Sequence, residues 1–496
     1  MPRIQGLHFI LLISQALAVA ACDGEGFFAE PIQPPTCIAG YSCEDSGLDI
    51  HDEQTLGEAR AALIAHVWKR RGFPVDVYAR KVGAATSPID GLSNLERIDD
   101  LAYEMALAPE EGEGSFVYHA HHFVPSQRVG RLVLVHQGHD GTLVNYGLDT
   151  ALRFFIARGF DVVALRMPLF GDNAGPRSSH GAIMSLESET RCGLQFFMEP
   201  VLAALNAVLQ EGQYEDVSMI GISGGGWTTD LYSALDVRVG LSFSVAGSLP
   251  RDLRTGGDAE ERHELLDYRD LYVLGGSEGR RHFQVLNPRD GCCFWGTDYR
   301  RYENVVGSAA RALGGDFLVY LDVTIPERHR ISQAALDTPV ALALEGRDLR
   351  ILDNTSSGFG YPGSAYGETA LSGEKWATLA GGFENDRLKA APEQPGDAEV
   401  NWVFRGLRAG RYQVSATWVA GEDRASNAVY RIEDGTSLLG SVSVDQRIDP
   451  AGRTELGIAW QVLQSPVTPA GDTLVVRVSN EANGFVIADA VTVERL

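Results

Sequence analysis

The sequence predicts an α/β domain, with a mostly parallel sheet and helices on both faces, followed by an all-β sandwich. Up to about residue 345, short apolar runs alternate with helical stretches, which is typical of strands joined by crossover helices. From Arg350 onward the chain is rich in Gly, Ser and Thr and carries short alternating strands, for example at 410–418 and 472–478. The length of 496 residues also indicates more than one domain.

The first residues have the pattern of an export signal. Arg3 gives a positive start, and the apolar stretch that follows at 9–20 is short for a membrane span. Residues 17–22 resemble a bacterial lipobox, which implies that Cys22 carries lipid and anchors an exported protein to a membrane of the bacterial cell envelope. The alternative is ordinary cleavage after Ala20, which would leave Cys22 as a thiol in a secreted protein.

The composition divides the chain into four segments. A signal at 1–22 is followed by a flexible linker at 23–50, which is acidic and contains several prolines. The α/β domain is expected at 51–347 and the sandwich at 348–496. The net charge of −24 argues against nucleic acid and anionic lipid head groups as partners, because both need a basic face.

The first elements of the α/β domain can be assigned in order. A helix at 55–71 has apolar spacing suited to packing on a sheet, and residues 116–124 alternate like an edge strand. We expect both to complete the domain and not to form a separate lid. A buried strand follows at 131–135.

An apolar strand at 217–222 ends in a glycine-rich turn around Ser223. Gly221 and Gly225 flank the serine with the G-x-S-x-G spacing of a nucleophile elbow, a tight strand-to-helix turn that exposes the hydroxyl. The pattern alone also fits a structural turn. A phosphate-binding loop does not fit, because the P-loop lysine is missing and the spacing differs from G-x-G-x-x-G.

An acid and a histidine follow the serine in the order that such a nucleophile requires. A short strand at 283–287 runs into a turn that contains Asp290, and a strand at 317–325 is followed by His329. We therefore predict Ser223, Asp290 and His329 as the catalytic residues.

Two other carboxylates are alternatives for the acid. Asp298 lies eight residues after Asp290, and Asp322 is expected inside the following strand. A side chain inside a strand does not easily reach a histidine in a loop, so Asp322 is the weaker alternative.

The loop after the strand at 131–135 is the predicted site of the oxyanion donors. The backbone N–H groups of Gln137 or Gly138, together with that of Gly224, could face the negative oxygen of a tetrahedral intermediate.

The histidines of this region do not predict a metal site. We interpret His136 and His139 as loop packing. A metal set that joins them to His119, His121 and His122 lacks ligand spacing such as H-E-x-x-H. The sequence therefore predicts no metal and no other cofactor.

These motifs resemble the α/β-hydrolase superfamily over residues 55–345. The strand at 161–166, its loop at 167–172 and the helix at 194–210 look like the elements that precede the serine strand in that family. The resemblance implies that the serine attacks an ester or amide carbonyl, that the histidine moves the proton and that the acid orients the histidine. It implies a secreted hydrolase of small-molecule or polymer esters, carbohydrate esters included, with a peptidase as the alternative.

Most of residues 350–496 resemble the golvesin C-terminal-like domain, a jelly-roll β-sandwich often appended to secreted bacterial enzymes. The matching stretches are 353–359, 399–404, 425–430, 442–446 and 484–491. Related domains tend to carry tryptophan after the Asp-Gln segment, where this chain has Arg453 and Thr454.

Four tryptophans of the sandwich allow two interpretations. Trp376, Trp402, Trp418 and Trp460 could form a platform for sugars, or they could belong to the core, which is more usual for aromatic residues on alternating strands. A polysaccharide or another cell-surface ligand is therefore a candidate partner. A non-catalytic adhesion or glycan-binding protein is the alternative to an enzyme.

The cysteines fit an oxidising compartment. Cys37 and Cys43 are expected to close a small loop in the linker. Cys192 is expected to pair with Cys292 or Cys293, which would brace the loop of the predicted acid. If the lipobox cysteine carries lipid, one thiol is left over.

Overall fold

A computed structural model describes residues 47–496, except 70–71, 187, 255, 263–265, 288, 296–297, 323–324, 326–327, 355–366, 374, 436 and 456. The predicted signal and nearly all of the linker, with Cys22, Cys37 and Cys43, lie outside the described residues. Within the described residues, no helix is both long and apolar enough to cross a membrane.

The first domain is built on one nine-stranded sheet. Its strands are β1 Arg80–Ala84, β2 Leu95–Ala106, β3 Ser115–Pro125, β4 Leu132–His136, β5 Asp161–Leu165, β6 Val217–Ile222, β7 Val239–Val245, β8 Arg281–Leu286 and β9 Asp316–Leu321. The order is β1-β2-β3-β5-β4-β6-β7-β8-β9, antiparallel from β1 to β5 and parallel from β5 to β9. This order and the parallel ladder confirm the predicted α/β fold class.

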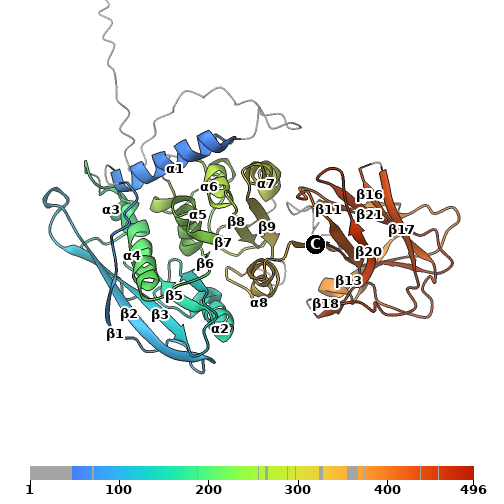
Figure 1. Cartoon of the computed structure of the whole chain (residues 1–496), viewed down its shortest axis with the longest axis horizontal. Coiled ribbons are helices and arrows are strands. Elements are labelled where there is room, and N and C mark those ends of the chain that lie inside the picture. The colour runs from blue at the N-terminus through green and yellow to red at the C-terminus, as the bar shows by residue number, and fades with distance from the viewer. Residues whose placement is uncertain are drawn as a thin grey trace, which may run out of the picture.

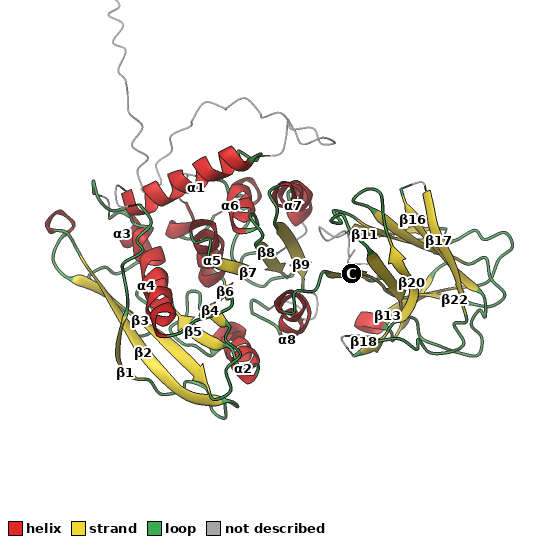
Figure 2. Cartoon of the chain, viewed as in Figure 1, coloured by secondary structure: helices red, strands yellow, loops and turns green. Residues whose placement is uncertain are grey.

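Helices cover both faces of the sheet. They are α1 Glu53–Trp68, α2 Leu148–Ala157, α3 His180–Met184, α4 Gln195–Glu211, α5 Gly224–Leu235, α6 Tyr268–Gly275, α7 Glu303–Ala312, α8 Gln333–Ala335 and α9 Ala341–Leu344. Figure 1 shows α4, α5 and α6 on one side of the sheet and α2 and α8 on the other. Figure 2 shows the same layers coloured by secondary structure. A capping box between Asp52 and Thr55 starts α1, close to the predicted start.

The prediction that residues 116–124 form an edge strand is wrong. β3 pairs with β2 on one side and with β5 on the other. The apolar and polar positions alternate because only part of the strand is covered on both faces, and the last six residues of β3 are all buried. The edge is formed instead by β1, all of whose residues are exposed.

The second domain is an all-β sandwich, as predicted. Its main sheets have the orders β10-β23-β15-β20 and β11-β14-β21-β16-β17, with smaller sheets β12-β13-β22 and β18-β19. The strands are β10 Leu349–Leu352, β11 Gly367–Ser372, β12 Ala377–Ala380, β13 Asp386–Ala390, β14 Glu399–Phe404, β15 Tyr412–Ala416, β16 Ala428–Asp434, β17 Ser437–Val444, β18 Thr454–Glu455, β19 Ile458–Ala459, β20 Gln461–Val467, β21 Leu474–Ser479, β22 Val486–Ala488 and β23 Val491–Arg495. Apolar side chains from both main sheets form one core between them.

The tryptophans belong to the interior of this domain. Trp402, Trp418 and Trp460 are buried, and Trp376 packs against the core. The interpretation as a sugar-stacking platform is therefore wrong for the buried three, because a platform has to offer its ring faces to solvent.

The two domains meet at the amino end of β9. Arg408 donates a hydrogen bond to the backbone oxygen of Gly315 at 2.8 Å. The buried guanidinium of Arg350 lies 3.9 Å from the carboxylate of Asp316, the first residue of β9. Figure 1 shows the sandwich on this side of the sheet, beside β9.

Asp489 is a buried acid of the sandwich and predicts a dependence of stability on pH. Its carboxylate accepts the backbone N–H of Phe383 at 3.0 Å, but burial raises the pKa of Asp489 to about 7. The folded state thus holds this proton more tightly than the unfolded chain, where an aspartate has a pKa of about 4. The resulting stabilisation is complete below pH ~4 and is lost as the pH rises through about 7.

We therefore expect Asp489→Asn to reduce the fall in free energy of unfolding between pH 5 and pH 8, by up to about 3 kcal/mol. Calorimetry at both pH values measures the difference. Asp449→Asn, at an exposed aspartate of the same domain, is the control. Equal pH slopes for Asp489→Asn and the wild type would show that burial does not hold this proton.

Candidate active site

Ser223 occupies a sharp turn between β6 and α5. Its φ of 58° and ψ of −126° lie in a region that residues other than glycine rarely adopt. The backbone is held on both sides of the turn, because the Ser223 N–H donates to the oxygen of Val245 at 3.0 Å and the Ser223 oxygen accepts the Trp227 N–H at 2.9 Å. The side chain remains partly exposed. This is the turn that the G-x-S-x-G spacing predicts.

The flanking glycines are required by close contacts with backbone. A Cβ added to Gly221 would lie 2.0 Å from the oxygen of Gly225, and a Cβ added to Gly225 would lie 2.2 Å from the oxygen of His136. Neither contact can be relieved by rotating a side chain. The glycines therefore allow α5 to start directly against β6 and the loop after β4.

We expect Gly221→Ala to lower the free energy of unfolding by about 3 kcal/mol or more, because the added methyl group overlaps fixed backbone. Urea unfolding followed by circular dichroism measures the change. The matched control is Gly57→Ala in α1, where nothing lies within 4 Å of the added Cβ, and a gain of up to about 1 kcal/mol is expected. A Gly221→Ala protein as stable as the wild type would contradict the strained turn.

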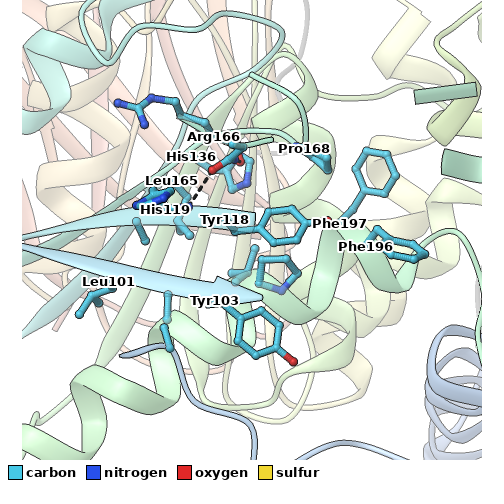
Figure 3. A pocket seen from close by; sticks show the side chains of 16 residues that line it. Leu101, Tyr103, Tyr118, His119, His136, Leu165, Arg166, Pro168, Phe196 and Phe197 are labelled. Atoms are coloured by element: carbon cyan, nitrogen blue, oxygen red, sulfur yellow. Dashed lines mark hydrogen bonds between the residues drawn. The ribbon is translucent and has the colours of Figure 1, made fainter. Parts of the chain in front are cut away.

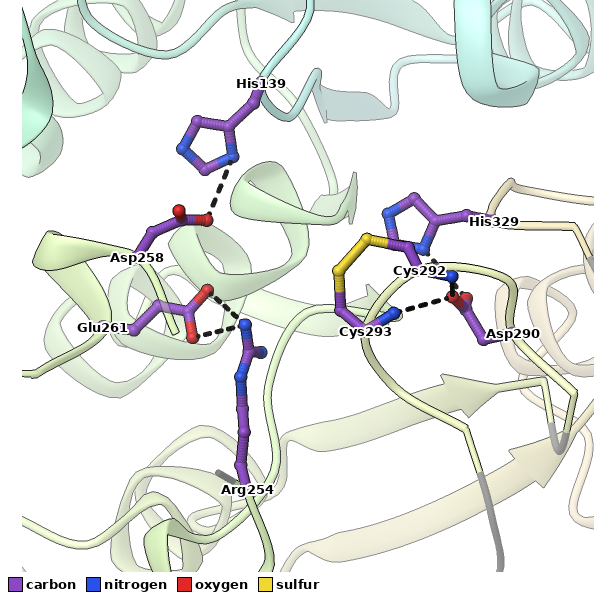
Figure 4. Close-up of a disulfide and its surroundings, with 8 residues drawn as sticks. All are labelled: His139, Arg254, Asp258, Glu261, Asp290, Cys292, Cys293 and His329. Carbon is purple, nitrogen blue, oxygen red and sulfur yellow. Dashed lines mark hydrogen bonds and ion pairs between the residues drawn. A yellow bond between two sulfur atoms is a disulfide. The ribbon is translucent and has the colours of Figure 1, made fainter. Parts of the chain in front are cut away.

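Asp290 and His329 are paired at the carboxyl ends of adjacent parallel strands. Asp290 follows β8, His329 follows β9, and the two strands pair directly. Nδ1 of His329 lies 2.8 Å from Oδ2 of Asp290, and both side chains are largely buried (Figure 4). Two loops distant in sequence therefore meet because their strands are neighbours in the sheet.

Several donors hold the carboxylate of Asp290. Its Oδ1 accepts the backbone N–H groups of Cys292 at 2.7 Å and Cys293 at 3.1 Å (Figure 4). Burial alone would raise the pKa of Asp290, but the hydrogen bonds from His329 and these two N–H groups outweigh it and hold the pKa below its usual value. Asp290 is therefore ionised throughout the neutral pH range.

The second ring nitrogen of His329 is left free. Nε2 is buried and has no hydrogen-bond partner among the described residues. The ring stacks on Phe294 and meets the edge of Tyr146, with centroids 6.2 and 5.8 Å away. Asn287 donates to the backbone oxygen of Arg328 at 3.0 Å and so holds the histidine loop. Sequence reasoning missed Asn287 and Phe294, which carry no motif.

The alternative acids do not pair with His329. Asp298 is exposed at the start of a short 3-10 helix, Asp298–Arg301. Asp322 is not inside a strand as predicted, because β9 ends at Leu321. The backbone N–H of Asp322 donates to the oxygen of Leu286.

Two of the predicted oxyanion donors are already engaged. The N–H of Gln137 donates to the oxygen of Leu165 at 2.9 Å, and the N–H of Gly138 donates to Oε1 of Gln137 at 3.0 Å. The assignment of Gln137 and Gly138 as donors is therefore wrong. The bond from Gln137 links the end of β4 to β5, and the bond from Gly138 goes to the side chain of the preceding residue. No sequence motif marks either bond.

The next residue of the loop has a free N–H instead. The backbone N–H of His139 has no acceptor among the described residues. Gly138 places this loop against the turn of Ser223, since an added Cβ there would lie 2.7 Å from Cβ of Ser223. Gly224 presents the first N–H of α5, which has no acceptor within the helix.

The disulfide of this region differs from the prediction. Cys292 is bonded to Cys293 (Figure 4), so the expected pairing of either with Cys192 is wrong. Cys192 lies in a different part of the domain, with its Sγ 3.7 Å from Nε2 of His66 in α1. The cysteine pair still belongs to the acid loop, through the two N–H groups that bind Asp290.

Most histidines near β3 and β4 have separate partners. His119 lies 2.9 Å from Asp100, and His122 lies 3.0 Å from Asp161, so they do not converge on one metal. His136 donates from Nδ1 to the oxygen of Gln137, and burial lowers the pKa of His136 to about 4. It is neutral and packs the loop, as interpreted from the sequence.

A small cavity between β2, β3 and α4 is separate from Ser223. Aromatic side chains line it, among them Tyr103, Tyr118, Phe196 and Phe197 (Figure 3). Its free volume of about 10 Å³ is at the lower limit for one water molecule. It does not hold a substrate.

Comparisons with known proteins place the second domain in a family. No curated protein matches the chain. Among solved structures, a xanthan lyase of Paenibacillus has 22% identity and a TM-score of 0.24, over 30% of this chain and only 13% of the lyase. An acetyl xylan esterase from Paenibacillus sp. R4 has 14% identity and a TM-score of 0.41, over 61% of this chain and 97% of the esterase. A glucuronoyl esterase from Solibacter usitatus has 10% identity and a TM-score of 0.41, over 63% and 98%. Residues 364–495 match the family model of the Golvesin C-terminal domain, so the sandwich carries that domain, as its resemblance implied.

Proposed function

We propose that this protein is a serine hydrolase that cleaves carboxylic esters, with Ser223 as nucleophile, His329 as base and Asp290 as the acid that orients the base. The observation that carries the proposal is the pair of Asp290 and His329, which leaves Nε2 of the histidine free in the same part of the sheet as a strained, partly exposed serine. A structural turn would need neither the strained backbone nor the free nitrogen.

The residues suggest a two-step acyl transfer. The Ser223 oxygen attacks the ester carbonyl while its proton passes to Nε2 of His329, and the bond to the alcohol breaks as His329 returns that proton to the leaving oxygen. Water, deprotonated by the same nitrogen, then releases the acid and restores the serine. Asp290 fixes the tautomer with hydrogen on Nδ1 and stabilises the imidazolium that forms in each step.

The oxyanion of each tetrahedral intermediate would be bound by backbone donors. Gly224 and His139 each have an N–H without an acceptor in the described residues, beside Ser223. We assign the oxyanion hole to these two groups. Removing one such donor in other hydrolases costs about 10²- to 10³-fold in kcat.

We further propose that the protein is exported and that its sandwich has an accessory role. The lipobox resemblance at 17–22 supports an enzyme held at the cell envelope by lipid on Cys22. A ligand of the sandwich, such as a polysaccharide, would have to bind a surface other than the buried tryptophans.

The test is labelling of the purified full chain by a fluorophosphonate probe, with turnover of p-nitrophenyl esters and of a peptide p-nitroanilide in parallel. We expect one labelled site, and turnover of the esters but not of the anilide. Anilide turnover as fast as ester turnover would favour the peptidase. A folded protein that neither labels nor turns over would favour an adhesion protein.

A further inference from the structure

A buried group of two histidines and a glutamate lies beside the candidate active site. Nε2 of His139 and Nδ1 of His180 lie 2.7 and 2.8 Å from the same oxygen of Glu260, and 3.2 Å from each other. His139 lies in the loop after β4, His180 begins α3, and Glu260 lies in the short helix Ala259–Arg262. Three separate elements therefore converge on one point.

When His180 is neutral, this group directs a ring lone pair at its own carboxylate. Nε2 of His180 lies 2.9 Å from the backbone oxygen of Pro168, which requires hydrogen on Nε2. A neutral His180 then directs the lone pair of Nδ1 at the carboxylate of Glu260. That carboxylate is fully buried, and its second oxygen has no hydrogen-bond partner among the described residues. A positive charge at this point, supplied by protons on the imidazoles or by a metal ion, would balance the carboxylate.

We propose that His139, His180 and Glu260 bind a zinc ion. The three atoms form a nearly equilateral triangle. An ion at the usual zinc distance of about 2.0–2.1 Å from each atom would lie about 1 Å out of their plane. Two imidazoles and one carboxylate form a donor set that zinc favours, and three protein ligands leave one position for water.

Neighbouring oxygens lie beside the other ring nitrogen of each histidine. A metal-binding histidine commonly directs its other ring nitrogen to a backbone oxygen or a carboxylate. His180 does so to Pro168 at 2.9 Å, and His139 does so to Asp258 at 3.6 Å (Figure 4). The rings of Phe170 and Phe197 pack around the two histidines and limit access of water.

Other groups of possible ligands in the described part of the chain are already used. Asp290, Cys292 and His329 belong to the candidate active site, and Cys292 is in a disulfide. In the group of Asp99, His122 and Glu211, Asp99 is paired with Lys81 and Arg97. The His139 group differs because its members converge on one another, without a lysine or arginine on the glutamate.

The zinc ion would fix the loop that carries the free N–H of His139. A Cβ added to Gly224 would lie 2.8 Å from Cε1 of His139, so this ring packs directly against the residue after Ser223. Holding His139 from α3 and from Glu260 would keep its backbone in place beside the serine. Metal binding itself does not depend on the proposed hydrolase activity.

The first test is the metal content of the purified full chain after treatment with a chelator and return of zinc. We expect about one bound zinc per chain by mass spectrometry of the metal, and at least about tenfold less in His180→Ala and in Glu260→Gln. The melting temperature of the wild type should rise by about 5 °C or more with zinc. His119→Ala, which removes a histidine outside the group, is the matched control and should retain the ion.

A second readout needs no variant. Cobalt in place of zinc should give the strong visible absorption of a four-coordinate site in the wild type. Absence of this spectrum, no bound zinc, or loss of zinc in His119→Ala but not in His180→Ala would overturn the proposal. Fluorophosphonate labelling of the same samples reports on the serine separately, so failure of the metal site and failure of the hydrolase can be told apart.

Discussion

Ser223→Ala is expected to lower kcat for p-nitrophenyl esters by about 10⁵- to 10⁶-fold and to abolish fluorophosphonate labelling. The alanine cannot form the acyl intermediate, and no other described hydroxyl occupies the turn between β6 and α5. The backbone of the turn should persist, because the hydrogen bonds at 3.0 and 2.9 Å that hold Ser223 involve only main-chain atoms. Steady-state turnover and gel-based labelling measure both effects.

The matched control for this variant is Ser218→Ala. Ser218 lies on the same strand, is buried, and its hydroxyl has no hydrogen-bond partner among the described residues. We expect its removal to change kcat by less than about twofold. If Ser223→Ala retained turnover or labelling, the nucleophile would be a different residue.

Asp290→Asn is expected to lower kcat by about 10⁴-fold. The asparagine can still accept the N–H groups of Cys292 and Cys293, so the loop should keep its shape. Its amide would donate to Nδ1 of His329, which places the hydrogen of the neutral ring on Nε2. The histidine could then not accept the serine proton. Turnover at saturating ester measures the loss.

Asp298→Asn provides the comparison, since Asp298 is an exposed carboxylate eight residues further along the same loop. It should leave kcat within about twofold of the wild type. A large loss in Asp298→Asn with little change in Asp290→Asn would assign the acid to Asp298.

Much of the fold could be predicted because the central strands are covered on both faces. Every residue of β4, β5 and β6 is buried, so each reads as a continuous apolar run. The outer strand β1 is exposed at every position and has no such signal. Its neighbour β2 is buried at only four of twelve positions and has no such run either. Without these two strands, β3 resembled the edge of the sheet, which explains the error there.

The candidate site was predictable only where chain order and turn chemistry specify it. Ser223, Asp290 and His329 each follow a strand, and parallel pairing brings the ends of such strands together. A backbone N–H can bind an oxyanion only if it has no other acceptor in the folded protein. No local sequence pattern indicates which N–H groups have an acceptor. His180 and Glu260 are 80 residues apart, so their contact has no spacing to recognise.

The contact between the domains determines where the sandwich lies relative to the candidate site. Arg408 and Arg350 hold it at Gly315 and Asp316, where β9 begins, whereas His329 follows the other end of that strand. Six residues of strand span about 20 Å. From there the sandwich cannot close over Ser223 as a cap. In the proposed hydrolase, the sandwich would therefore contribute away from the candidate site and not as a cover over bound substrate.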